Sequence, residues 1–143
     1  MVTPMGDEVS AFIARFKAMG LTGTPATARE VAVLEKQVGI PFPAAYKAFL
    51  LILGCDGGPD FIGSDCTTRH VPRLRQGAEE LLREFGSSFT LPENAVVFLM
   101  HQGYYFVYFV ADAGLEDPPV FAYLEGDAAP LQKAESFSAW LAL

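Results

Sequence analysis

The 143-residue sequence has little that would serve cross-linking or membrane insertion. It contains two cysteines, Cys55 and Cys66, which do not form a C-x-x-C pair, so we expect reduced thiols and no disulfide framework. Its longest apolar runs, 48–53 and 104–111, fall far short of the ~20 residues that a membrane span needs. Residues 1–10 lack the basic and apolar regions of a signal peptide. We therefore expect a soluble, cytoplasmic protein.

Basic residues are also scarce. There are ten against seventeen acidic residues, which gives a formal net charge of −7. This charge repels phosphate backbones and argues against direct nucleic-acid binding, whereas it suits solubility or a basic protein partner. The sequence has no G-x-x-x-x-G-K-[ST] or G-x-G-x-x-G loop for phosphates and no G-x-S-x-G nucleophile motif. We expect no cofactor and no catalytic residues.

Zinc is the alternative that the few strong metal ligands leave open. Cys55, Cys66, His70 and His101 are the only cysteines and histidines in the chain. The three-residue gap between Cys66 and His70 suits zinc, but structural zinc usually takes two close pairs, and Cys55 and His101 each stand alone. We therefore expect no metal site.

Apolar residues in the first half of the chain recur at helical spacing. They predict helices over 9–19, 27–38, 43–53 and 74–85. The sequence Thr27-Ala28-Arg29-Glu30 is a capping box, and Pro43 suits the first turn of the third helix. Residues 56–72 are rich in Gly, Asp, Ser and Thr, which predicts a long exposed loop with a short strand around Phe61-Ile62.

The apolar period changes from 3.6 to 2 after Pro92. Strands are predicted over 96–100, 104–110 and 120–124, with a short edge strand near 131–133. His101-Gln102-Gly103 is predicted to be the turn of the first hairpin, and Ser136 the N-cap of a last helix. The fold class is then α+β, with N-terminal helices packed on an antiparallel meander and a C-terminal helix, in a single domain of residues 1–143. The expected core includes Tyr46, Phe49, Leu50, Phe106, Phe137 and Trp140.

The segment 40–58, IPFPAAYKAFLLILGCDGG, resembles the signature of the SUKH superfamily in its Smi/Knr branch. The matching residues are Pro43, Tyr46, Lys47, Phe49, Leu50, Leu51, Gly57 and Gly58. Asp56 stands where the signature usually has asparagine. The later runs VVFLMHQGYYFVYF, EDPPVFAYLEG and SFSAWL are also similar to this branch, so the resemblance covers residues 28–143.

The resemblance implies N-terminal helices packed on an antiparallel sheet. It also implies a function in binding, because bacterial proteins of this kind are proposed to be immunity proteins that neutralise toxins, many of them nucleases. Other members are regulatory interaction modules. The family has no established catalytic residues, so the resemblance assigns none to this chain.

Two acidic loops and two tyrosines are the candidate partner-binding residues. They are Asp56, Asp60 and Asp65 in one loop, Asp112, Glu116 and Asp117 in another, and Tyr104 and Tyr123 as aromatic anchors. The spacing of the first three aspartates does not match the alternating ligands of an EF-hand. We expect a non-enzymatic, immunity-type protein that binds a basic toxin and neither nucleic acid nor membrane. The alternatives are a regulatory interaction protein, or a small enzyme or ligand-binding domain with a pocket near His101, Gln102 and Tyr104.

Overall fold

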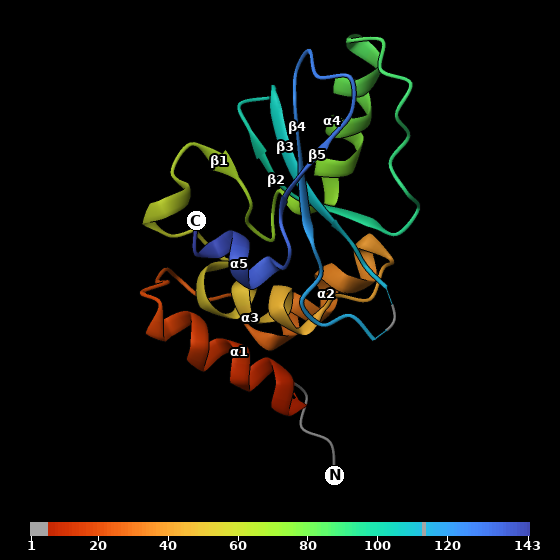
Figure 1. Cartoon of the computed structure of the whole chain (residues 1–143). Helices are drawn as coiled ribbons and strands as arrows, with labels where there is room; N and C mark the ends of the chain where they lie inside the picture. Colours follow the sequence, from red (N-terminus) through yellow and green to blue (C-terminus); the bar gives the residue numbers. More distant parts are fainter. Residues whose placement is uncertain (1–5, 113) are drawn as a thin grey trace.

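The computed structural model describes residues 6–112 and 114–143 (Figure 1). The helices are α1 (Gly6–Ala18), α2 (Ala28–Val38), α3 (Ala44–Leu53), α4 (Val71–Glu84), α5 (Phe137–Leu141) and the 3-10 helix η1 (Pro59–Phe61). The strands are β1 (Ser64–Asp65), β2 (Ala95–His101), β3 (Tyr105–Val110), β4 (Val120–Leu124) and β5 (Leu131–Ala134). They form one antiparallel sheet in the order β1-β2-β3-β4-β5. The predicted α+β class is confirmed.

Two of the segments discussed in the sequence analysis extend beyond the described residues. One is the N-terminal segment that we expect not to be a signal peptide, of which residues 1–5 are not described; the other is the second acidic loop, of which residue 113 is not described. In the part of the chain that the structure describes, no helix has both the length and the apolar character required to cross a membrane.

Helix α3 lies at the centre of the molecule. Eight of its ten residues are buried, because its sequence AAYKAFLLIL is apolar around almost its whole circumference. In Figure 1, α1 packs on one side of α3, and α5 and the sheet lie on the other. The capping box at the start of α2 is confirmed: the Thr27 hydroxyl accepts from the Glu30 N–H at 3.1 Å, and the Glu30 carboxylate accepts from the Thr27 N–H at 2.8 Å.

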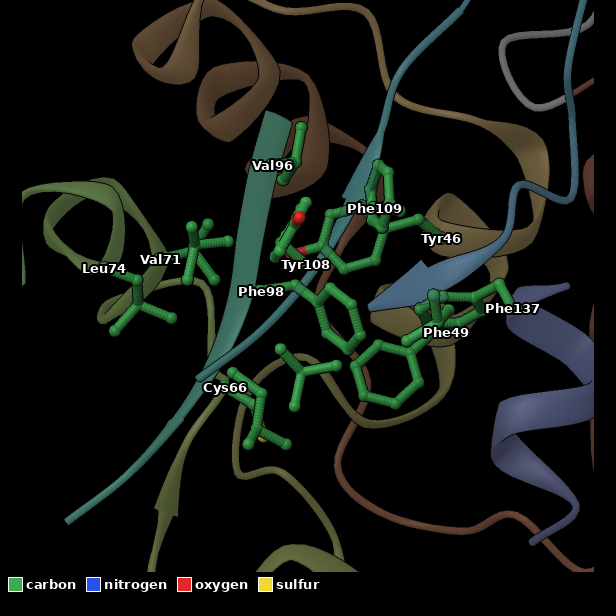
Figure 2. Close-up of a cluster of buried hydrophobic side chains, with 14 of the residues drawn as sticks. Tyr46, Phe49, Cys66, Val71, Leu74, Val96, Phe98, Tyr108, Phe109 and Phe137 are labelled. Atoms are coloured by element: carbon green, nitrogen blue, oxygen red, sulfur yellow. The ribbon is translucent and has the colours of Figure 1, made fainter. Parts of the chain in front are cut away.

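Tyr46 of α3 joins the helices to the sheet through an aromatic cluster. Its ring centroid lies between 4.9 and 6.1 Å from those of five phenylalanines: Phe42, Phe49, Phe98, Phe109 and Phe137. Figure 2 shows how all of these side chains except Phe42 converge from α3, β2, β3 and α5. The Tyr46 hydroxyl is buried and has no hydrogen-bond partner among the described residues, and burial raises the pKa of Tyr46 far above its usual value.

Both faces of β3 are covered, as its apolar run predicts. Phe109, whose ring contacts Tyr46, lies on the face toward α3 and α5, together with Val107 and Tyr105 at alternate positions. Tyr108 lies on the opposite face, where it contacts Phe89 of the segment that follows α4. Five of the six predicted core residues have no exposed surface. Trp140 is only half-buried, although its ring packs against Phe98 and Phe61.

The segment between α3 and α4 differs from its prediction in three ways. Phe61 ends η1, and the short strand is Ser64–Asp65, which forms because the edge of β2 offers backbone partners at Met100 and His101. The loop is not uniformly exposed, since Cys66 is fully buried. Helix α4 begins at Val71, three residues earlier than predicted, because the following proline suits a first turn and the Val71 side chain is buried.

The first hairpin turn is one residue later than predicted. His101 belongs to β2, where it pairs with Tyr105, and the loop consists of residues 102–104. Gln102 and Gly103 have φ values of 49° and 79°, and the Tyr104 N–H donates to the His101 carbonyl at 3.2 Å. Positive φ at both central residues is the requirement of a type I′ turn, which matches the twist of the flanking strands.

The central cluster generates a prediction with two contrasting substitutions. Phe49→Ala should lower the free energy of unfolding by about 3–5 kcal/mol, because it leaves a cavity in the core. Tyr46→Phe should change it by less than about 1 kcal/mol, because it keeps the ring and removes a buried hydroxyl without a partner. Denaturant unfolding measures both values. A loss above about 2 kcal/mol for Tyr46→Phe would show that the hydroxyl is bonded in solution.

Candidate functional site

The antiparallel meander places the predicted binding residues at two ends of the sheet. We call the end with the β2–β3 and β4–β5 turns the hairpin end; it is at the top of Figure 1. We call the opposite end, with residues 111–119 between β3 and β4, the loop end. Tyr104 lies at the hairpin end, and so does Asp65, which pairs with Met100 near that turn. Asp112, Glu116 and Asp117 lie at the loop end, so the structure does not bring the two acidic loops together.

Helix α3 separates the two acidic loops. The loop-end acid Glu116 contacts the first residue of α3, whereas Asp56 follows the last turn of α3. A ten-residue helix is about 15 Å long, so the two loops lie roughly that far apart.

Asp56 has a structural role at the C-terminal end of α3. Its Oδ1 accepts from the backbone N–H groups of Thr24 and Gly58, each at 2.9 Å, and its Oδ2 accepts from the Thr24 hydroxyl at 2.8 Å. These hydrogen bonds lower the pKa of Asp56, and the bond from the Thr24 N–H has the largest effect. Gly58 is required beside it, because its φ is 68° and an added Cβ would lie 2.4 Å from the Thr22 carbonyl oxygen.

Glu116 and Asp117 cap two different helices. The Glu116 carboxylate accepts from the N–H of Ala44, the first residue of α3, at 2.7 Å. Pro43, the N-cap residue of α3, offers no side-chain acceptor, so Glu116 supplies it from a distant loop. The Asp117 carboxylate accepts from the N–H and hydroxyl of Ser138 in α5, at 2.9 and 2.7 Å. Both acids therefore hold the fold together as well as carrying charge.

The remaining candidates are more available to a partner. Asp60 is exposed, the Asp65 carboxylate lies 3.7 Å from His70 Nε2, and Asp112 accepts from the Asn94 amide at 3.4 Å. Tyr104 is 37% exposed. The prediction that Tyr123 is an exposed anchor is wrong: its side chain is fully buried, since it stacks on Phe106 at 5.5 Å between ring centroids.

The four candidate zinc ligands do not assemble. Nδ1 of His101 is bonded to the Ser64 hydroxyl at 2.9 Å, and Nδ1 of His70 to the Thr67 hydroxyl at 2.8 Å. Within residues 6–112 and 114–143, no three His, Cys, Asp or Glu side chains form a group that could hold a metal ion. That the protein binds no zinc stays a prediction.

The hollow beside the first hairpin does not contain the predicted His101 and Tyr104 site. It has a volume of about 290 Å³ and is lined by Asp65, His70, Arg73, Leu74, Gly77, Met100 and Gly103. The bond between Ser64 and His101 resembles part of a catalytic triad, which also needs an acid to orient the histidine. The described contacts of His101 are Ser64 and the edge of the Tyr104 ring, so the arrangement is not a triad.

The charge distribution is a signal that the sequence reasoning missed. Seven acidic residues and no lysine or arginine lie in residues 84–132: Glu84, Glu93, Asp112, Glu116, Asp117, Glu125 and Asp127. The remaining ten acidic residues are balanced by the ten basic ones. The formal net charge of −7 therefore belongs to the segment that forms β2, β3, β4 and their connections.

The chain matches the family model described as "SMI1 / KNR4 family (SUKH-1)" over residues 25–143. The match includes the signature segment 40–58 and all five strands. It confirms the resemblance that we based on the sequence motifs. No curated protein matches the chain.

Asp56 generates a prediction about pH. The pKa of the Asp56 carboxyl is lower in the folded than in the unfolded chain, so its hydrogen bonds stabilise the fold fully at pH values above its unfolded-state pKa. This stabilisation is lost as the pH falls through its folded-state pKa. Asp56→Ala should therefore be less stable than wild type at neutral pH, and the difference should shrink in acid. Asp56→Asn should stay close to wild type at neutral pH, because an amide can satisfy the same partners, and its advantage over Asp56→Ala should not depend on pH. Thermal unfolding between pH 7 and pH 3 measures both; a pH-independent gap between wild type and Asp56→Ala contradicts the assignment.

The two thiols should differ in reactivity. Cys55 is exposed and Cys66 is buried, and burial, with smaller effects from the charges of Asp65 and Asp56, raises the pKa of Cys66 to about 12. The thiolate is the reactive form, so a disulfide reagent at pH 8 should label Cys55 rapidly and Cys66 only after denaturation. A Cys55→Ser variant is the control. Rapid labelling of that native variant would show that Cys66 is accessible.

Proposed function

We propose, since the chain belongs to the SMI1 / KNR4 family (SUKH-1), that it acts by binding another protein, as an immunity-type inhibitor that neutralises a toxin in the cytoplasm. Proteins of this family are generally not enzymes, and many are immunity proteins. The observation that carries the proposal is the segregation of the whole net charge of −7 into residues 84–132. The proposal treats residues 1–143 as one domain, and the packing of α1 on α3 supports including the first helix.

An acidic inhibitor fits a basic toxin such as a nuclease. An enzyme that binds a phosphate backbone presents lysine and arginine around its substrate site, and these attract an acidic protein over a distance. Attraction of this kind raises the association rate and is weakened by salt. By covering the basic site, the inhibitor would keep the nucleic acid out.

The candidate residues have different parts in this proposal. Asp60, Asp65, Asp112 and Tyr104 are exposed enough to contact the partner. Asp56, Glu116 and Asp117 contribute charge, but their hydrogen bonds within the fold make them unsuitable for charge-reversal tests.

The test compares two variants with the same net charge. The first is Glu93→Gln, Asp112→Asn and Glu125→Gln, within the acidic segment. The control is Asp7→Asn, Glu80→Gln and Glu135→Gln, outside it. Each changes the formal charge from −7 to −4. With the cognate toxin of the proposal, a basic nuclease, as the partner, the first variant should associate about three- to tenfold more slowly at low salt, and the control should stay near wild type.

The outcomes separate the competing functions. Protection of cells that express the toxin, together with the selective loss of association rate, supports an immunity protein. Equal slowing by both variants means that total charge, and not the acidic segment, governs association. A wild-type protein that neither binds the toxin nor protects the cells refutes the immunity role and leaves the regulatory interaction module.

A further inference from the structure

The strand register aligns a row of side chains across the hairpin end, of which Leu124 is exposed and the other three are partly buried. Ser64 pairs with His101, His101 with Tyr105, and Tyr105 with Leu124. Directly paired residues project from the same face of a sheet, so these side chains lie side by side across four strands. The bond of 2.9 Å between the Ser64 hydroxyl and His101 Nδ1 agrees with this arrangement.

The row lies on the same face of the sheet as Phe109 and Val107, which is the face that α3 and α5 cover. Phe109 on this face is buried against Tyr46, Val107 is fully buried, and Tyr105 is the next residue in the same alternation toward the hairpin end. Helix α5 has only five residues, about 8 Å of length, so it cannot extend over the whole face. In Figure 1, α5 lies below the upper half of the strands.

Large apolar side chains remain exposed at this end. Leu124 is 44% exposed. Leu131 of β5 is 57% exposed and pairs with Ala122, which lies two residues before Leu124 in β4. Tyr104, whose ring edge contacts His101 at 5.6 Å between centroids, adds an aromatic side chain. A contiguous apolar patch with tyrosines and a polar rim is typical of the centre of a protein interface.

We propose that these five residues, His101, Tyr104, Tyr105, Leu124 and Leu131, form the surface on which the partner docks; we call them the hairpin-end patch. The proposal rests on the proposed function, and it adds the place and the chemistry of the contact. The partner that fits is a protein with an apolar side chain surrounded by lysine or arginine.

The charge around the patch favours a basic protein as the partner over a second copy of this chain, nucleic acid or anionic lipid. The turn next to the patch carries Glu125 and Asp127. Two cationic side chains lie at its borders: Lys133, two residues beyond Leu131 in β5, and Arg73, which lines the hollow beside Gly103. A second copy would bring two acidic turns together, and each copy has a net charge of −7. Nucleic acid and anionic lipid are repelled by the same turn. A basic protein has both complementary charge and apolar surface.

The experiment uses two leucines of equal exposure at opposite ends of the sheet. Leu124 lies in the patch, and Leu115, which is 45% exposed, lies at the loop end. Each is changed to Lys and to Glu, and the affinity for the same toxin nuclease is measured by calorimetry. Leu124→Lys should weaken binding at least about tenfold, since it removes an anchor and repels a basic partner. Leu124→Glu should weaken it less, and both Leu115 variants should bind within about twofold of wild type.

Three results overturn the proposal in distinguishable ways. Equal affinities of Leu124→Lys and Leu115→Lys place the docking surface elsewhere while the proposed function stands. A weaker complex with Leu124→Glu than with Leu124→Lys shows that the partner surface is acidic. No complex with the wild-type protein refutes the proposed function itself. Thermal unfolding of each variant verifies the fold, and Tyr104→Ala, which should also weaken binding, is a second patch variant if Leu124→Lys is unstable.

Discussion

The packing of Tyr46 among five phenylalanine rings is the interaction on which the rest of the structure depends. These rings come from α3, its preceding loop, β2, β3 and α5, so one side chain is in contact with most layers of the fold. Aromatic side chains bury large areas, and edge-to-face contacts add a geometric preference to that burial. The orientation of α3 against the sheet follows from this cluster, and the ends of α3 determine where both acidic loops lie.

Acidic residues secure both ends of α3. Glu116 accepts a hydrogen bond at its N-terminus, and Asp56 ties its C-terminus to Thr24 in the connection between α1 and α2. A carboxylate suits a helix N-terminus because the unpaired N–H groups there carry partial positive charge. The acidity of the chain therefore has two uses, some carboxylates stabilising the fold and others remaining free in solution. This distinction explains why a count of acidic residues overestimates the charge that a partner can contact.

The same division explains the contrast between the two ends of the sheet. At the loop end, consecutive acids cap α3 and α5, and these bonds fix the connection between β3 and β4. At the hairpin end, α5 is too short to cover Tyr105 and Leu124, and apolar surface stays exposed beside an acidic turn. The family signature lies around α3 and stabilises the fold, so it identifies the family without marking the surface that binds.

Periodicity in the sequence determined the elements. The spacing of apolar residues predicted the five helices and the strands β2 to β4 close to their observed bounds, because helix and strand patterns depend on residues near one another in the chain. Tyr46 and Phe49 were predicted as core for the same reason. The candidate site was predicted less well: both acidic loops were identified, but three of their six carboxylates accept hydrogen bonds from backbone N–H groups elsewhere in the fold. Asp56 bonds across 32 residues, Glu116 across 72 and Asp117 across 21, and no local pattern contains such contacts. The burial of Tyr123, the pairing of β1 and the alignment of Ser64, His101, Tyr105 and Leu124 in one row likewise follow from strand order and register, which only the tertiary structure decides.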